Sequence, residues 1–290
     1  MGTPGGKNVR EGLLIMNATK KDVVLQLMDV KKIFAQGTVD EVTALNGVSL
    51  TMYDQDFISI IGSNGAGKST LLNIVAGVFP PERGGRVIIN GDDVTNLQEF
   101  RHAAYAGRVW QQPGVGTAGN LTLEENLSLA LLRGARRGIR AAINKQRRQL
   151  FYEALTPLGL CLEDRLTTLA GTLSGGQRQA LSLVMATISK PAILLLDEHT
   201  ATLDPKTGQT VLSLTEMIVE RERMTTIMVT HNMEMALKYG NRLVMMHQGK
   251  IVVDMDEEEK RSLAVNDLVT AFEQASGEQF KDDSILLSHR

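Results

Sequence analysis

A glycine-rich loop between an apolar segment and a helical segment constrains this chain more than any other feature. The apolar segment FISII at residues 57–61 runs directly into GSNGAGKST at residues 62–70, and a helical pattern continues from residue 69 to residue 78. This is the phosphate-loop pattern, which requires a strand before the loop and a helix after it. The chain therefore predicts a site for nucleotide phosphates at the end of a buried strand.

Each residue type in this loop has a chemical reason. Glycines let backbone N–H groups close around a phosphate, and the positive end of a helix attracts the anion. We predict that Lys68 reaches the β- and γ-phosphates and that the Ser69 hydroxyl binds Mg²⁺. The predicted nucleotide-binding residues of the loop are Gly62, Ser63, Asn64, Gly65, Ala66, Gly67, Lys68, Ser69 and Thr70.

Short apolar segments alternate with helical patterns along the chain, which is typical of an α/β domain with a largely buried sheet. Gln248-Gly249 predicts a hairpin between residues 242–247 and 250–254. Residues 122–172 show helical periodicity with few strand patterns, so we expect an inserted helical subdomain there. Further strands are predicted at 23–30, 48–53, 192–196 and 225–230, and a short helix at 266–274.

Two acidic residues, Asp197 and Glu198, directly follow the apolar segment 192–196. In open α/β sheets, ligands bind at the carboxyl ends of the strands. The pair therefore predicts a role beside the phosphates. A pair of acids that only caps the strand is the structural alternative.

A second glycine-rich sequence, LSGGQ at residues 173–177, precedes another helical pattern. The glycines after Ser174 expose backbone N–H groups at a predicted helix start, which makes a second anion site. Because the loop with Lys68 is already predicted to bind the phosphates, the LSGGQ sequence is a second phosphate-binding surface in a chain that has one nucleotide site. This sequence resembles the signature of the ABC ATPase family, and the resemblance extends from about residue 22 to residue 254.

The resemblance implies a P-loop NTPase core of the ABC ATPase type, with an antiparallel β subdomain and an inserted helical subdomain at about residues 113–172. We expect residues 22–254 to form this ATPase domain, 1–21 a flexible N-terminal extension, and 255–290 a C-terminal helical tail. The family binds ATP with Mg²⁺ and works as a pair of copies placed head to tail. Each ATP would then lie between the phosphate loop of one copy and four residues of the other: Ser174, Gly175, Gly176 and Gln177.

The same resemblance assigns roles to four residues of the catalytic centre. Asp197 would hold the water shell of Mg²⁺, and Glu198 would orient or deprotonate the attacking water. His231 follows the apolar segment 225–230 and would contact the γ-phosphate. Gln111, in VWQQP, would reach Mg²⁺ and the attacking water while its loop touches a membrane subunit. Gln112 is the alternative if the register shifts by one residue.

The resemblance also assigns roles outside the catalytic centre. Asp204, in TATLD, would face the partner copy, and Phe34 would stack on adenine, with a buried core phenylalanine as the alternative. We interpret Trp110 as a packing residue. The remaining histidines are interpreted as structural or solvated: His102, His199, His247 and His289.

A basic segment without acids lies in the predicted helical subdomain and contains Arg133, Arg136, Arg137, Arg140, Lys145, Arg147 and Arg148. We interpret it as a solvated face, with attraction to anionic lipid headgroups as the alternative. A nucleic-acid surface is disfavoured, because the chain has a formal net charge of −2 and no aromatic residue is interleaved with these cations.

No stretch of the sequence reaches the roughly 18 consecutive apolar residues that a membrane-spanning helix needs. The resemblance therefore implies separate transmembrane permease subunits, a peripheral position on the cytoplasmic face of the inner membrane and, for an importer, an extracytoplasmic solute-binding protein. Residues 109–130 and 265–288 resemble ATPase subunits assigned to tryptophan or tyrosine uptake. That group commonly has an acid where Gln112 stands.

Two alternatives to an importer stay open at this point. An ATPase of a lipid, lipoprotein or drug exporter shares the same motifs. A non-transport ABC ATPase that acts on ribosomes or DNA is disfavoured. Ribosome factors carry two cassettes in one chain, whereas this chain has one phosphate loop and one signature. Chromosome and repair ATPases insert long coiled coils or zinc-binding cysteines, whereas this chain has one cysteine.

Overall fold

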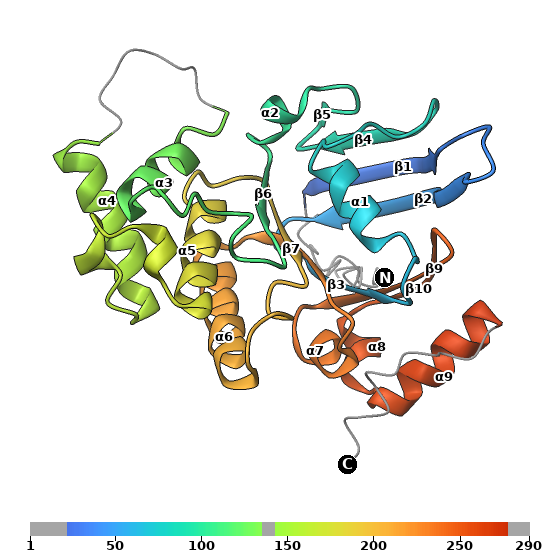
Figure 1. Ribbon diagram of the computed structural model, residues 1–290. Coiled ribbons are helices and arrows are strands. Elements are labelled where there is room, and N and C mark those ends of the chain that lie inside the picture. The colour runs from blue at the N-terminus through green and yellow to red at the C-terminus, as the bar shows by residue number, and fades with distance from the viewer. Residues whose placement is uncertain (1–21, 135–142, 278–290) are drawn as a thin grey trace, which may run out of the picture.

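The computed structural model describes residues 22–134 and 143–277. The predicted extension over 1–21 lies outside these ranges, as do Arg136, Arg137, Arg140 and His289. Two sheets organise the described chain (Figure 1). The larger has six strands, in the order β10 (Lys250–Met255), β9 (Arg242–His247), β3 (Phe57–Gly62), β8 (Thr225–Val229), β7 (Ile193–Asp197) and β6 (Ala106–Val109). The smaller has four, in the order β2 (Val42–Tyr53), β1 (Val23–Phe34), β4 (Arg86–Ile89) and β5 (Asp92–Asp93).

The central strands of the larger sheet are continuous apolar segments. Every residue of β3 and β8 is buried, and β7 is buried as far as Leu196. β3 pairs in parallel with β8 and β9, and β7 pairs in parallel with β8 and β6, so both faces of these strands need cover. The α/β class expected from the sequence is confirmed.

The predicted hairpin at the edge of this sheet is also confirmed. β9 and β10 pair antiparallel around Gln248 and Gly249, whose φ angles are 44° and 74°. A two-residue hairpin turn of type I′ requires a positive φ at both of its central residues. The Gly249 N–H donates to the Ala66 carbonyl at 3.1 Å, so the turn supports the glycine-rich loop.

Helices cover both faces of the larger sheet (Figure 1). The small antiparallel sheet and α1 lie on one side, and the helices that follow β6 gather on the other. The helices are α1 (Lys68–Val75), α2 (Glu99–His102), α3 (Leu123–Leu131), α4 (Lys145–Leu155), α5 (Gly175–Thr187), α6 (Pro205–Glu222), α7 (Met233–Lys238), α8 (Glu257–Arg261) and α9 (Val265–Ser276). Short 3-10 turns occupy Thr156–Leu158, Glu163–Arg165 and Ala170–Thr172.

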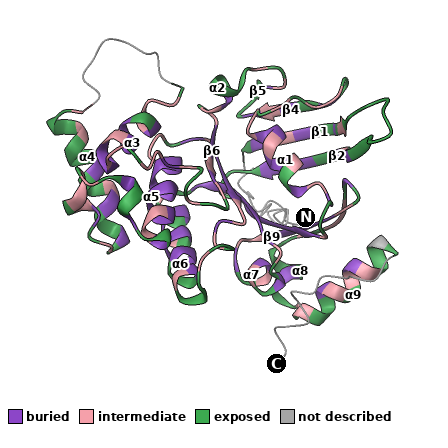
Figure 2. Cartoon of the chain, viewed as in Figure 1, coloured by how far each residue is buried: buried purple, intermediate pink, exposed green. Residues whose placement is uncertain are grey.

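Apolar side chains form separate clusters on the two faces of the larger sheet. One cluster joins its strands to α3, α4, α5 and α6, and another joins them to α1 and the small sheet. Figure 2 shows the central strands of the larger sheet buried along most of their length. The edge strand β10 is exposed or half-buried instead. The carboxyl ends of the rigid central strands therefore offer a fixed platform for side chains.

Several elements differ from the sequence expectations. β1 continues to Phe34 and β2 begins at Val42, because the two strands pair along almost their whole length. β6 was not predicted: its sequence AGRV is short and contains a glycine and an arginine. Its Gly107 lies so close to α5 that an added Cβ would be 2.1 Å from the Ala186 carbonyl oxygen.

The last helix, α9, is close to the predicted short helix. Its residues Leu268 and Phe272 are buried in a third apolar cluster, together with Met233 and Ala236 of α7. The preceding α8, in the acidic segment, was not predicted. Among the described residues, no helix is long and apolar enough to pass through a lipid bilayer.

Candidate nucleotide site

The glycine-rich loop lies between β3 and α1, as its motif requires. Gly62 and Gly67 have φ angles of 155° and 97°. A Cβ on Gly62 would be 2.1 Å from the backbone oxygen of Met246, and one on Gly67 would be 2.4 Å from that of Ala44. These glycines are therefore required by close backbone packing against β9 and β2, as well as by the turn itself.

Lys68, the first residue of α1, folds back over the loop. Its side chain is buried, and its Nζ donates to the carbonyl oxygens of Gly62 at 2.6 Å and Ser63 at 3.1 Å. The loop thus places a cation and the N-terminus of α1 at the same point, which is an arrangement suited to an anion.

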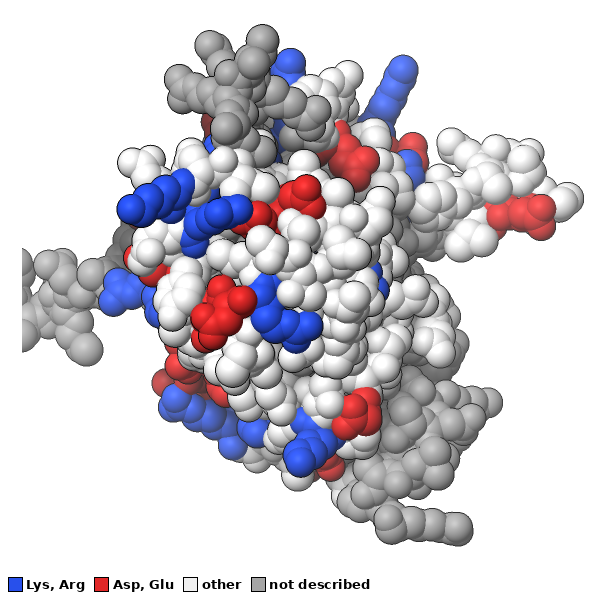
Figure 3. Space-filling view, turned by 60° about the vertical axis from the view of Figure 1, so that its left-hand side comes forward, with Lys and Arg blue, Asp and Glu red and all other residues white. Residues whose placement is uncertain are grey.

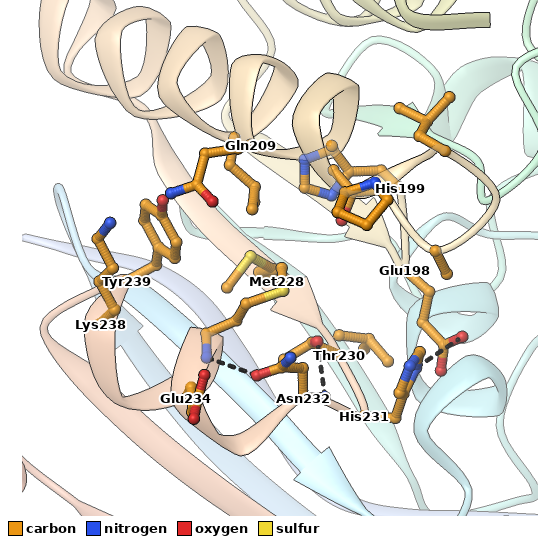
Figure 4. Close-up of a pocket in the computed structure, with 18 of the residues that line it drawn as sticks. Glu198, His199, Gln209, Met228, Thr230, His231, Asn232, Glu234, Lys238 and Tyr239 are labelled. Carbon is orange, nitrogen blue, oxygen red and sulfur yellow. Dashed lines mark hydrogen bonds and ion pairs between the residues drawn. The ribbon is translucent and has the colours of Figure 1, made fainter. Parts of the chain in front are cut away.

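Three predicted site residues converge beside this loop. Gln111, Glu198 and His231 directly or closely follow β6, β7 and β8, which are neighbours in the sheet. The Glu198 Oε2 atom accepts from Gln111 Nε2 at 3.4 Å and lies 3.4 Å from His231 Nδ1. Figure 4 shows the Glu198 and His231 side chains facing each other at the edge of a pocket of about 460 Å³. Gln111, rather than Gln112, makes the contact with Glu198.

Comparison with known proteins identifies this arrangement. A family model described as ABC transporter matches residues 45–201. A tyrosine transport ATP-binding protein of Clostridioides difficile (strain R20291) is 42% identical over 252 residues, covering 87% of this chain and 100% of that protein. The chain belongs to the ABC transporter ATP-binding family.

Other relatives and solved structures agree with this assignment. A methionine import ATP-binding protein of Rhizobium johnstonii is 33% identical over 81% of this chain, but the match spans only 61% of that longer protein. The solved dimeric ATP-binding cassette MJ0796, bound to ADP and Pi, is similar with a TM-score of 0.68 and 29% identity, covering 80% of this chain and 98% of that chain. The protein is an ATP hydrolase with the α/β P-loop fold of ABC ATPases.

The electrostatic environment of this ABC ATPase favours the ionised form of Glu198. The hydrogen bond with His231 lowers the pKa of the Glu198 carboxyl, and the charges of His231 and Lys68 lower it further, against the opposing effect of partial burial. The Glu198 backbone has a φ of 44°, which is uncommon for a residue with a Cβ and carries strain. Such strain is sustained only where surrounding contacts hold the segment.

The donor set at this end of the ABC ATPase sheet fits Mg²⁺. The Ser69 hydroxyl, the Asp197 carboxylate and the Gln111 amide oxygen are the oxygen ligands that Mg²⁺ prefers. In the part of the chain that the structure describes, no group of three or more His, Cys, Asp or Glu side chains forms a metal cage. Mg²⁺ in nucleotide sites is usually held by one or two protein ligands together with phosphate oxygens and water. The residues therefore suit a metal that arrives with the nucleotide.

Asp197 has a partner that sequence reasoning missed. Arg108 Nη2 donates to Asp197 Oδ2 at 2.6 Å, and its Nη1 donates to Asn73 Oδ1 at 2.5 Å. The guanidinium carbon of Arg108 lies 3.6 Å from the centroid of the Trp110 ring. The interpretation of Trp110 as a packing residue is therefore incomplete, because its half-buried ring stacks on a cation. No motif could have indicated these contacts, since they join three separate elements.

The signature residues cap α5. Ser174 is its N-cap: its Oγ accepts from the Gln177 N–H, and the Gln177 side chain accepts from the Ser174 N–H, both at 3.3 Å. The predicted helix start is confirmed. An added Cβ on Gly176 would be 2.3 Å from Thr207 Cγ2, so the first turn of α5 packs against α6. In Figure 1, α5 and α1 lie on opposite sides of β6 and β7.

Asp204, assigned to the partner interface, is the N-cap of α6 here. Its Oδ1 accepts from the Thr207 N–H at 3.1 Å, and hydrogen bonds with Thr207 lower the pKa of this exposed carboxyl. Phe34 is 39% exposed at the end of β1, so the buried-core alternative is wrong. Its ring meets that of Phe79 edge-on, with centroids 5.4 Å apart.

The remaining predictions concern the histidines and the basic segment. His102 and His199 are buried and hydrogen-bonded, as expected of structural histidines. Arg148, interpreted as part of a solvated face, is 54% exposed, and its guanidinium also makes a two-pronged pair with the buried Glu124 at 2.7 and 2.9 Å, which ties α4 to α3. Figure 3 shows basic and acidic side chains interspersed on the face that it displays, with no single continuous basic patch among the residues coloured there.

Proposed function

We propose that this ABC ATPase works as a head-to-tail pair and drives the import of a tryptophan- or tyrosine-like amino acid through separate permease subunits. The observation that carries the hydrolytic part is the convergence of Gln111 and His231 on one oxygen of Glu198, beside the phosphate loop. The relative named for tyrosine transport, which aligns over its full length, supports the choice of solute. Residues 22–254 would form the ATPase domain and residues 255–290 a tail.

Each residue of the site has a task in phosphoryl transfer. The ionised Glu198 orients the attacking water and accepts its proton, and Gln111 and His231 hold the carboxylate in place while contacting the water and the γ-phosphate. Lys68 and the backbone N–H groups of the loop bind the phosphates, and Phe34 stacks on adenine. Mg²⁺, held by Ser69, Gln111 and Asp197, would neutralise charge on the phosphate oxygens. The chemistry is thus mainly positioning and charge neutralisation.

The second copy completes the site in this proposal. Ser174, Gly175 and Gly176 would bind the nucleotide held by the other copy, and Asp204 would lie near the interface. Closing the pair around two nucleotides would move the loop that carries Gln111, and with it the permease. The ATPase would sit on the cytoplasmic face of the membrane, and an extracytoplasmic solute-binding protein would deliver the solute.

Replacing the catalytic carboxylate tests the hydrolytic part. Glu198→Gln keeps the shape of the side chain but removes the proton acceptor, so we expect kcat to fall by about 10²- to 10⁴-fold while ATP affinity is retained. Glu216→Gln, on the exposed face of α6, is the matched control and should hydrolyse ATP at the wild-type rate. Rapid turnover by Glu198→Gln would remove this residue from the mechanism.

Replacing the loop lysine tests phosphate binding separately. Lys68→Ala removes a charged donor, so we expect the Kd for ATP, measured by calorimetry, to rise at least about tenfold. An unchanged Kd would contradict the assignment of the phosphate loop.

The solute is tested with the complete transporter. The ATPase, its permease and its solute-binding protein would be reconstituted in vesicles with ATP on the ATPase side, and uptake of labelled tyrosine, tryptophan and methionine compared. We expect ATP-dependent uptake of an aromatic amino acid, abolished by Glu198→Gln. Outward movement of a lipid or drug with no amino-acid uptake would favour the exporter instead.

A further inference from the structure

Arg108 on β6 is a buried cation that contacts α1, β7 and the segment directly after β6. Its side chain is 8% exposed, and that of its partner Asp197 is 15% exposed. One arm of the guanidinium bonds Asp197 at the end of β7, the other bonds Asn73 of α1, and its face lies on Trp110. Its Nε has no hydrogen-bond partner among the described residues, so two hydrogen bonds and the stacked ring hold the group.

These contacts connect the helix after the phosphate loop with the segments that carry Glu198 and Gln111. Asn73 belongs to the helix that follows the phosphate loop, and Asp197 precedes Glu198. Trp110 precedes Gln111, whose amide contacts Glu198. A planar guanidinium can bond two acceptors and stack on an indole at the same time, which a lysine ammonium cannot do. The geometry of Arg108 therefore uses the properties that distinguish arginine from any other cation.

We propose that Arg108 is a positioning residue that couples occupation of Asp197 to the position of the Trp110–Gln111 segment. This inference rests on the proposed roles of Asp197 and Gln111. A Mg²⁺–nucleotide attracts the same carboxylate that Arg108 holds, so the two cations compete for it. When the hold of Asp197 on the guanidinium weakens, the stack on Trp110 changes and the segment that carries Gln111 is free to reposition.

Tryptophan fluorescence tests the coupling, because Trp110 is the one tryptophan in the chain. The full-length protein would be titrated with a slowly hydrolysed ATP analogue, once with Mg²⁺ and once with EDTA. We expect a change in Trp110 emission that requires both nucleotide and Mg²⁺. A wild-type protein that binds the Mg²⁺–nucleotide without any change in emission would overturn the proposal.

Two substitutions separate coupling from structural support. Arg108→Met removes the cation, and Arg108→Lys keeps the charge but cannot bond two acceptors and stack. We expect Arg108→Lys to keep most of the thermal stability. The amplitude of its Mg²⁺-dependent emission change should nevertheless be about tenfold smaller than that of the wild type. If lysine restores the response as well as the stability, the role is structural and the proposal is wrong.

Two further variants test whether the emission change depends specifically on the contacts of Arg108. Arg101→Met is the matched control, because the exposed Arg101 also lies over an aromatic ring, that of Phe100, with its guanidinium carbon 5.7 Å from the centroid. It should respond as the wild type does. Asn73→Ala keeps the Arg108–Asp197 pair, so it should reduce the Mg²⁺-dependent change in Trp110 emission only in part. This variant can be measured even if Arg108→Met does not fold. A full response in Asn73→Ala and Arg108→Lys would refute the coupling.

Calorimetry in EDTA distinguishes a failure of this inference from a failure of the proposed function. Nucleotide should bind to Arg108→Lys with a Kd within about twofold of the wild-type value, because Lys68 and the loop are unchanged. Wild-type protein that binds no nucleotide would overturn both proposals. Normal binding and hydrolysis with an emission change that does not depend on Arg108 would overturn this one alone.

Discussion

His199 shows how one buried side chain can support the catalytic residue beside it. Its Nε2 lies 3.0 Å from Thr215 Oγ1, and the Thr215 hydroxyl donates to the Val211 carbonyl, so the histidine nitrogen must be the donor. The His199 carbonyl accepts from Gln179 Nε2 at 2.7 Å, and the same Nε2 donates to the Trp110 carbonyl. The imidazole and the backbone carbonyl of His199 thus both anchor the residue that follows the strained Glu198.

The burial of this histidine has a consequence for acid stability. Desolvation lowers the pKa of His199 to about 4, from an ordinary value of 6.5. Between these values the unfolded chain binds the proton and the folded chain does not, so stability falls as pH falls through this window. We expect the wild type to lose about 2 kcal/mol of unfolding free energy between about pH 7 and pH 5 through this group.

His199→Gln provides the comparison for this prediction. Glutamine can donate to Thr215 but does not titrate, so the difference in unfolding free energy between wild type and variant should narrow or reverse in acid. Urea denaturation at the two pH values measures it. A difference that is independent of pH would show that His199 is not buried in its neutral form.

At the scale of elements, α9 is attached to the domain by a small number of apolar residues. Phe272 and Leu268 are buried, and the Phe272 ring meets the His247 ring edge-on with centroids 5.5 Å apart. Lys260 of α8 adds a buried attachment through the Tyr239 and Gly240 carbonyls, and burial lowers the pKa of its ammonium to about 8. The helical pattern predicted α9, but only packing shows which face is covered.

Removal of one ring tests whether α9 is part of the folded unit. Phe272→Ala leaves a cavity against His247, and we expect it to cost about 3 kcal/mol if α9 unfolds together with the domain. Gln274→Ala, on the exposed side of α9, should leave the melting temperature nearly unchanged. If Phe272→Ala melts as the wild type does but is cleaved faster by protease within α9, the helix unfolds locally instead.

At the scale of the whole molecule, the separation of the two phosphate-binding motifs argues for a pair. Ser174 caps α5 on the helical side of the sheet, whereas Lys68 begins α1 on the other side. A second copy would bring the two motifs to one nucleotide. Ser174 is exposed, and among the described residues its Oγ makes one long hydrogen bond, of 3.3 Å, so the hydroxyl is accessible to a second copy.

A bulky charge at the cap of α5 tests this assembly. In a Glu198→Gln background with ATP and Mg²⁺, we expect a dimer by light scattering, and we expect Ser174→Arg to leave a monomer that still binds nucleotide through its own phosphate loop. Ser262→Arg, at an exposed position after α8, should still dimerise. A dimer that forms equally well with Ser174→Arg would place the interface elsewhere.

Much of the fold could be predicted because its signals are local. The strands β3, β7 and β8 are continuous apolar segments, and the loop after β3 has a motif that needs a strand and a helix around it. The sequence patterns do not predict β6 and α6, for different reasons. β6 is short and polar in part, whereas Asp204, the N-cap of α6, lies in a sequence whose resemblance points to the partner interface rather than to a helix start.

The chemistry of each motif follows from local sequence, because a strand, its following loop and the next helix turn lie within a few residues of one another. Which motifs meet depends on how the strands are ordered in the folded sheet. Gln111 and Glu198 are 87 positions apart, and they touch because β6 and β7 are neighbours in the sheet. The order of parallel strands depends on burying both faces of the sheet at once, so no local pattern could place Arg108 between Asn73, Trp110 and Asp197.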